Sequence, residues 1–435
     1  MKILLASIPA TGHFNPLLVA ANILKKAGHE TAFVTSALFR EKIEAAGSRF
    51  FPLPAEADQD WQDKIADILK RFIYAPALDE TAEIFKTAFV EPMPAQFRAL
   101  REALKEFPAD LIMHETSFTG VFPLLLGPRS ARPACVYLGI TASPLDRADG
   151  APWGPGLMPT QDPEKLKEYA ETAREFNEKK EFPIIAEANR LLADFGLPGL
   201  PGTIFASGAL LADIFLQPCV PSFEFPVREP AKKIHYIGAL LPKGAGDVPP
   251  GLKEAKKAGR KIVLVSQGTI ANNDLGKLLA PTIQGLGDRE DFLILATTGG
   301  KPIENIPCAL APNTVCSKYL NFGEVLPYVD VLVAFGSYGT VTQALSLGVP
   351  MVVAGRGEDK PEVGARVTAT GCGIYLATDT PTPEQICEAV DQILTKPEYR
   401  INSEKIRREF AAHNAEKELP ALIETLVEDQ QALVR

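Results

Sequence analysis

The feature that most constrains the fold is a series of short apolar runs that leave no polar face. "KILLASI" near the start and "KIVLVSQ" from residue 261 are examples, and each leads into a turn of small or polar residues. A strand with apolar side chains on both faces must be covered by helices on both sides, as the strands of parallel sheets are. Helical patterns separate these runs, so the sequence predicts an α/β fold with parallel sheets.

The N-terminal part shows this alternation clearly. "NPLLVAANILKKAG" predicts a helix with Asn15 as N-cap, Pro16 at its first position and Gly28 beyond its end. "ETAFVTS" predicts the next strand, Ser36 caps the helix "ALFREKIEAAG", and "SRFFPLP" follows as a third strand. "ADLIMHE" and "RPACVYLGI" predict two further buried strands.

The same layout begins again at residue 261, after a stretch rich in proline, glycine and lysine that marks a linker at 235–260. A chain of 435 residues, 46% of them hydrophobic, is long enough for two cores. We therefore expect two Rossmann-like, doubly wound domains, at 1–234 and 261–415, facing each other across a cleft. A last amphipathic helix, at 416–435, is expected to pack back on the body of the protein.

Composition excludes several classes of function. The net charge of -9 argues against nucleic acid or an anionic membrane as the main partner. No apolar run reaches the length of a membrane span. The six cysteines are scattered and form no CxxC pair, which favours free thiols in the cytoplasm over a zinc site.

The turn after the apolar run "VDVLVAF" predicts a phosphate site. Glycines in residues 336–340 let a ligand approach the backbone, the N–H groups of the following helix attract anions, and Thr340 adds a hydroxyl. The alternative is a tight turn with a capped helix. A second small turn with Ser266, Gly268 and Thr269 ends another strand of this domain, and two such turns suit a diphosphate.

Other nucleotide-binding motifs are absent. There is no G-x-G-x-x-G after either opening strand, which disfavours a nicotinamide enzyme, and no P-loop. The triplet "DQD" at 58–60 could hold a metal-bound nucleotide sugar, but its place at a polar helix start favours a solvated surface.

Together these motifs resemble the inverting UDP-glycosyltransferase superfamily with the GT-B fold, in particular its bacterial macrolide-glycosyltransferase-like branch. The resemblance covers nearly the whole chain. It is carried by "GHFNPLLVAANILKKAGHETAFVT", by "ADLIMHETSFTG" and by residues 319–367, which match the family's donor-binding pattern HGG-x-GT…E-AL…GVP…DQ…N-A-x-R-V. It implies transfer of a hexose from a UDP-sugar, foremost UDP-glucose, to a hydroxyl of a flavonoid, macrolide or other natural product, without a metal or other cofactor.

The resemblance places His13 at the family's catalytic base and Glu115 where an aspartate orients that base. Imidazole is well suited to take a proton from a hydroxyl near neutral pH, and a carboxylate behind it fixes its tautomer. The neighbouring His114 should face the other side of its strand, so we expect it to be structural.

The resemblance also assigns residues to the donor. Aromatic residues from position 319 to 322 would cover the base, with core packing as the alternative. Phe335 and Gln343 depart from a histidine and a glutamate of the family, and Lys360 departs from a glutamine. We expect Lys360 to pair with Glu358 or Glu362, although it could instead select a different sugar. The donor-binding residues are Ser266, Gly268, Thr269, Tyr319, Leu320, Phe322, Phe335, Gly336, Ser337, Tyr338, Gly339, Thr340, Gln343, Asp359 and Lys360.

A lipophilic or aromatic acceptor is predicted from aromatic residues in the N-terminal half, which could cover that side of the cleft. At least half of the aromatics in this region are expected to belong to the core instead. The predicted acceptor-binding residues are Phe14, Trp61, Phe72, Phe89 and Trp153.

Two other functions stay open on the sequence. One is another GT-B enzyme, such as a sugar-nucleotide epimerase. The other is a protein that binds a nucleotide sugar without transferring it, because fold alone does not guarantee activity.

Overall fold

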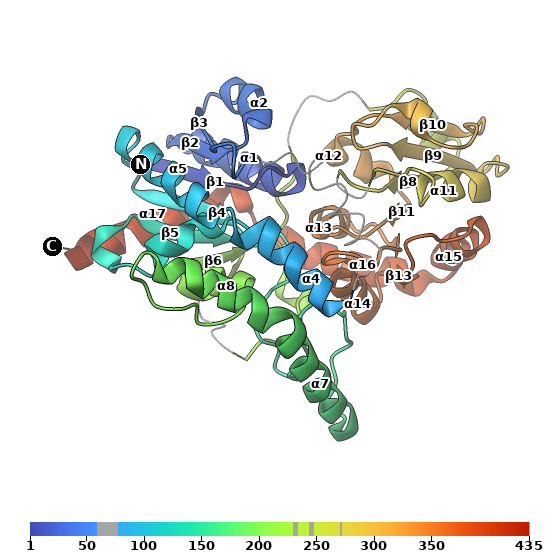
Figure 1. Ribbon diagram of the computed structural model, residues 1–435. Helices are drawn as coiled ribbons and strands as arrows, with labels where there is room; N and C mark the ends of the chain where they lie inside the picture. The colour runs from blue at the N-terminus through green and yellow to red at the C-terminus, as the bar shows by residue number, and fades with distance from the viewer. Residues whose placement is uncertain (59–76, 229–233, 243–247, 270–271, 435) are drawn as a thin grey trace.

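The structure, a computed structural model, describes residues 1–58, 77–228, 234–242, 248–269 and 272–434. It contains two parallel sheets, as the sequence predicts, and Figure 1 shows them side by side with helices around each. The first sheet has seven strands in the order β3-β2-β1-β4-β5-β6-β7, and the second has six in the order β10-β9-β8-β11-β12-β13.

The first sheet is built by the N-terminal half of the chain. Its strands are β1 (Lys2–Ala6), β2 (Glu30–Thr35), β3 (Arg49–Pro52), β4 (Leu111–Glu115), β5 (Ala134–Leu138), β6 (Ile214–Gln217) and β7 (Ile234–Tyr236). The helices are α1 (Thr11–Lys26), α2 (Arg40–Ala45), α4 (Leu78–Phe85), α5 (Met93–Glu106), α6 (Phe122–Leu125), α7 (Pro163–Phe176), α8 (Phe182–Ala193) and α9 (Ile204–Leu211). Two π-helical turns, η2 (Lys86–Val90) and η5 (Asn177–Glu181), follow α4 and α7.

The second sheet is built by the C-terminal half. Its strands are β8 (Lys261–Ser266), β9 (Phe292–Thr297), β10 (Thr314–Ser317), β11 (Val331–Ala334), β12 (Met351–Val353) and β13 (Gly373–Tyr375). The helices are α10 (Leu252–Lys257), α11 (Leu279–Leu286), α12 (Phe322–Val325), α13 (Tyr338–Ser346), α14 (Lys360–Thr370), α15 (Pro383–Thr395), α16 (Pro397–Ala411) and α17 (Ala415–Val434). Short 3₁₀ turns complete both halves at η1 (Ala37–Phe39), η3 (Thr119–Val121), η4 (Arg129–Ala131), η6 (Pro221–Phe223), η8 (Ile303–Asn305) and η9 (Leu326–Tyr328).

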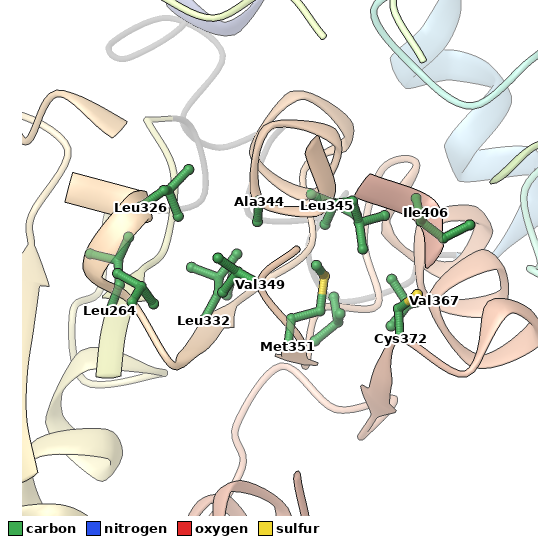
Figure 2. Close-up of a cluster of buried hydrophobic side chains, with 14 of the residues drawn as sticks. Leu264, Leu326, Leu332, Ala344, Leu345, Val349, Met351, Val367, Cys372 and Ile406 are labelled. Carbon is green, nitrogen blue, oxygen red and sulfur yellow. The ribbon is translucent and has the colours of Figure 1, made fainter. Parts of the chain in front are cut away.

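Both faces of each sheet are covered, which explains the apolar runs. In the second sheet, alternate side chains of one strand enter different cores: Leu332 faces one cluster, and Val331 and Val333 face the other. Figure 2 shows the first of these clusters, to which β8 contributes Leu264, β11 contributes Leu332 and α13 contributes Leu345. Burial of apolar surface on both sides supplies the main favourable term for such a sheet.

The chain crosses between the two halves twice. Within the predicted linker, 235–260, His235 and Tyr236 still belong to β7, and α10 packs on the second core. The last helix, α17, lies against α1 of the first half, as Figure 1 shows in red, and contributes Leu419 and Ile423 to that core.

One local prediction differs from the structure. Helix α1 begins at Thr11 rather than after Asn15, so Pro16 lies inside it and Ala10 takes the N-cap without a side-chain cap. The residues "TGHFN" are helical because the helix places Phe14 and Leu17 on one face, where both are buried in the core. Helix α9 and strand β6 were not anticipated. The cap at Ser36 is confirmed, since its hydroxyl accepts from the Leu38 N–H at 3.1 Å.

Asp213, just before β6, provides a test of how the first sheet is held together. Its carboxylate accepts from Arg132 at 2.8 Å, from Arg129 at 2.8 Å and from the Cys135 N–H at 2.7 Å. Burial raises the pKa of Asp213, but the hydrogen bond from Arg132 and the other donors outweigh it and hold the pKa below its ordinary value.

We expect Asp213→Asn to lower the free energy of unfolding by about 3 kcal/mol at pH 7, because two arginines lose their partner. This contribution exists above the unfolded pKa of about 3.9 and disappears as the pH falls through the lower folded pKa. Denaturant unfolding at pH 7 and at a pH below the folded pKa measures it, with the exposed Asp194→Asn as the control. An equal loss at both pH values would contradict the assignment.

Candidate active site

Each sheet has a switch point, where the order of its strands reverses. The predicted site residues lie at or just after the carboxyl ends of the strands there. In the first sheet β1 lies between β2 and β4, and in the second β8 lies between β9 and β11. Helices leave such neighbouring strands in opposite directions, which opens a crevice at their carboxyl ends where ligands bind. Glu115 ends β4, whereas Ser266 ends β8 and Ala334 ends β11.

His13 and Glu115 meet at the first switch point. His13 lies in the first turn of α1, and its Nδ1 is 2.9 Å from Glu115 Oε2. The side chain of Glu115 is wholly buried, whereas that of His13 keeps 17% of its surface exposed. The longer glutamate side chain therefore reaches the imidazole at normal hydrogen-bond length.

Backbone groups hold the Glu115 carboxylate in place. The Ile8 N–H donates to Oε1 at 3.1 Å and the Ser117 N–H donates to Oε2 at 2.7 Å. A carboxylate only accepts hydrogen bonds, so Nδ1 of His13 carries the proton. In the neutral ring Nε2 is then the nitrogen that can accept a proton.

His114 is the neighbour of Glu115 on β4 but plays another part. Its ring is buried and meets Tyr137 edge-on, with 5.5 Å between ring centroids, and its Nδ1 contacts the Glu115 carbonyl at 3.3 Å. Burial lowers the pKa of His114 to about 4, so this ring is neutral near pH 7. Its placement agrees with the structural role expected from the sequence.

The two small-residue turns of the second sheet lie beside each other. A Cβ added to Gly268 would be 3.8 Å from Ser337 Oγ, and Gly268 has a φ of +81° that suits glycine. Ser337 Oγ lies 3.2 Å from Thr340 Oγ1, and Ser337 precedes α13. The first N–H groups of α13 and these hydroxyls thus provide donors suited to an anion.

Two side chains assigned to the donor point elsewhere. Phe335 is buried in the core of the second half. Tyr338 is also buried, and its hydroxyl donates to Glu224 at 2.6 Å and accepts from Gln217 at 2.5 Å. Only the backbone of these two residues can bind a ligand at the turn. The Phe335 side chain packs in the core, and the Tyr338 side chain contacts the first half.

The predicted base-stacking stretch is only partly exposed. Tyr319 has 66% of its surface exposed, whereas Leu320 and Phe322 pack partly against the core. Gly300 beside the Tyr319 hydroxyl has a φ of +98°, a conformation that favours glycine. Gln343, expected near the ribose, donates from its amide to the Leu240 carbonyl at 3.3 Å.

Asp359 and Lys360 lie at the start of α14. The buried Lys360 ammonium pairs with Glu358, the local role expected for it. Burial raises the pKa of the Asp359 carboxyl to about 6, while the positive charges of Lys360 and His13 act to lower it. His13 belongs to the first half of the chain, and Asp359 belongs to the second.

The predicted acceptor residues fall into three groups. Phe14 is wholly buried and stacks on Phe39 at 4.2 Å between centroids, so its ring offers no surface to an acceptor and that prediction is wrong. Phe89 and Trp153 are half-buried and both contact Phe205, at 5.4 and 5.9 Å between centroids. Trp61 and Phe72 lie outside the described residues.

A set of buried polar residues that the sequence patterns did not indicate joins the two halves. Arg366 donates to Glu224 at 2.9 Å and to Glu362 at 2.9 Å, and all three side chains are buried. The available signal was a charged residue within an otherwise apolar stretch, as Glu224 is in "PSFEFPV".

Two features are absent from the described part of the chain. No three His, Cys, Asp or Glu side chains are grouped there so that they could hold a metal ion. None of the helices described has the length and apolar character needed to cross a membrane.

Comparison with known proteins supplies independent information. The family described as erythromycin biosynthesis protein CIII-like, C-terminal domain, matches residues 288–426. The chain is 32% identical over 428 residues to UDP-glycosyltransferase 2 of Phaeomoniella chlamydospora, covering 95% of this chain and 93% of that protein. It is 30% identical to 4'-demethylrebeccamycin synthase of Lentzea aerocolonigenes, covering 98% of this chain and 99% of that protein. Among solved structures, the calicheamicin glycosyltransferase CalG4 shares the fold, with a TM-score of 0.73, 19% identity and coverage of 98% of both chains.

The environment of Asp359 predicts a carboxyl that titrates near pH 6. Because an unfolded aspartate titrates at about 3.9, the native protein binds this proton more tightly, and the contribution of Asp359 to stability falls as the pH rises through this interval. Carboxyl ¹³C NMR should show a resonance titrating near pH 6 that is missing in Asp359→Asn. A wild-type spectrum without such a resonance would contradict the raised pKa of Asp359.

Proposed function

The chain belongs to the UDP-glycosyltransferases with the GT-B fold, and from this premise we propose that it transfers a hexose from a UDP-sugar to a hydroxyl of a lipophilic or aromatic small molecule, with inversion at the anomeric carbon. The observation that carries the proposal is the pair formed by His13 and Glu115, placed at a sheet switch point with Glu115 buried and His13 partly exposed.

His13 acts as the general base in this proposal. A hydroxyl is a poor nucleophile, and Nε2 of His13 takes its proton as the oxygen attacks the anomeric carbon. The ring becomes positively charged in this step. The Glu115 carboxylate, 2.9 Å from Nδ1, stabilises that charge and keeps the ring oriented.

The leaving UDP is stabilised at the second switch point. The bond from the anomeric carbon to the diphosphate oxygen breaks as the new bond forms on the opposite face, and the electron pair stays with the diphosphate. The N–H groups at the start of α13 and the hydroxyls of Ser337 and Thr340 then receive the negative charge. This chemistry requires no metal ion.

The sugar lies between the domains in this proposal. Asp359, at the N-terminal end of α14, accepts hydrogen bonds from sugar hydroxyls, and UDP-glucose is the donor we propose. The Lys360 ammonium pairs with Glu358 at the start of α14, so in this proposal it makes no contact with the sugar. Tyr319, as the exposed aromatic of its stretch, covers the uracil.

The acceptor is proposed to be a natural product such as a flavonoid or a macrolide. Support comes from the half-buried Phe89 and Trp153, which the structure brings together around Phe205. The names of two similar proteins refer to rebeccamycin and calicheamicin, both of them natural products. All six cysteines are free thiols, which supports the cytoplasm as the compartment.

We expect His13→Ala to lower the rate of transfer about a thousandfold, within the range that a positioned general base contributes. Calorimetric affinity for UDP should stay within about twofold of wild type, because the diphosphate binds at the other domain. His413→Ala, which removes a histidine paired with Glu418, serves as the control. Transfer by His13→Ala at the wild-type rate would refute the role of His13 as base.

A panel of flavonoids and macrolides, each incubated with UDP-glucose, tests the acceptor class. We expect products heavier by one hexose and a higher melting temperature with the compounds that react, because a ligand that binds the native state stabilises it. A protein that only binds the donor would show stabilisation by UDP-glucose without product, and an epimerase would convert UDP-glucose alone. Either result would contradict the proposed transfer.

A further inference from the structure

We propose that Glu362 is a positioning residue that fastens the Trp153 loop, defined as residues 142–157 of the N-terminal domain, to the helix of the C-terminal domain that begins beside Asp359. The inference rests on the proposed function, because the loop carries the predicted acceptor contact and the helix carries the predicted sugar contact. It adds a residue to which the sequence patterns gave no role at the site.

The two carboxylate oxygens of Glu362 accept hydrogen bonds from different partners. Oε1 accepts from the Gly154 N–H at 2.9 Å and from the Gly156 N–H at 3.0 Å. Oε2 accepts from Arg366 Nη1 at 2.9 Å, one turn along α14. The side chain is wholly buried, so each of these bonds forms where water does not compete.

The loop backbone lies directly on α14 at this point. Gly156 has a φ of +65°, and a Cβ added to it would be 2.1 Å from the Pro361 carbonyl oxygen. A side chain at Gly156 would push the loop away from the helix. Glycine at this position and the carboxylate of Glu362 therefore support the same contact from its two sides.

Hydrogen bonds within the loop also connect its two ends to each other and to Trp153, so that these parts move together. Arg147 donates to the Leu157 carbonyl at 2.5 Å and pairs with Asp149 at 2.6 Å. The Trp153 indole N–H donates to the Ala142 carbonyl at 3.3 Å. Trp153 itself directly precedes Gly154, the first of the two glycines that Glu362 holds, so the position of its ring depends on that carboxylate.

Arg366 supplies the charge that allows two carboxylates to be buried together. It pairs with Glu224 of the N-terminal domain as well as with Glu362, and its guanidinium lies 4.3 Å from the Phe225 ring. Arg147 of the loop lies over the same ring, at 4.7 Å. The contact from α14 to the loop is thus part of a continuous buried network that spans both domains.

The expected consequence is a selective defect in acceptor binding. When Glu362 is replaced by alanine, the loop loses its hold on α14 and Trp153 becomes more mobile, while the diphosphate turn at Ser337 is untouched. We expect the KM for the acceptor to rise about tenfold and the KM for the UDP-sugar to change by less than about twofold. Glu362→Gln should be intermediate, because an amide can satisfy either the glycine N–H groups or Arg366, but not both.

The test combines kinetics with a fluorescence measurement. Trp61 and Trp153 are the only two tryptophans, so in a Trp61→Phe background the emission reports on the loop alone. Acrylamide should quench Trp153 more strongly in Glu362→Ala and in Gly156→Ala than in the parent. Thr368→Ala, on the exposed side of the same helix, is the matched control and should match the parent. Melting temperature and UDP affinity verify that each variant is folded.

Unchanged quenching in both Glu362→Ala and Gly156→Ala would overturn the anchoring of the loop. Increased quenching with an unchanged acceptor KM would overturn its role in acceptor positioning. The quenching measurement needs no turnover, so it distinguishes failure of this inference from failure of the proposed transferase activity: a protein without transfer would still show the effect of Glu362 on Trp153.

Discussion

A buried carboxylate needs hydrogen-bond donors, and the positions of the donors to Glu115 determine the geometry of the site. Two donors are backbone N–H groups, from Ile8 beyond β1 and from Ser117 beyond β4, and the third is the ring of His13. The first sheet brings β1 and β4 together at its switch point, and this makes the arrangement possible. The orientation of the proposed base is therefore a consequence of how the sheet is wound, and it does not depend on a flexible loop.

Much of the fold could be predicted because each element is encoded locally. Buried strands such as "KIVLVS" are apolar on both faces, and Ser36 is a cap that acts through its own hydroxyl. The start of α1 could not be predicted in this way, because the core that holds Phe14 extends the helix beyond what Asn15 and Pro16 suggest. Tertiary packing overrides local capping signals at that point.

Site residues could be predicted where their position along the backbone is enough to bring them to the site. They could not be predicted where the direction of the side chain decides whether it reaches the site. The family resemblance assigned His13 and Glu115, which both lie near strand ends, and the structure brings them together. Phe14 and Tyr338 carry side chains that a sequence cannot orient, and both are committed to buried contacts. The link from Glu362 to Gly154 and Gly156 joins residues more than two hundred positions apart, and no local pattern encodes it.

The central claim is that one domain aims an imidazole at a hydroxyl while the other holds the diphosphate that leaves. A crystal structure with a non-transferable UDP-sugar and an acceptor bound tests it most directly. The account predicts the acceptor oxygen about 3 Å from Nε2 of His13, within hydrogen-bond reach, and the diphosphate on the N–H groups that begin α13. A nucleotide bound away from Ser337, or an acceptor hydroxyl out of reach of His13, would contradict it.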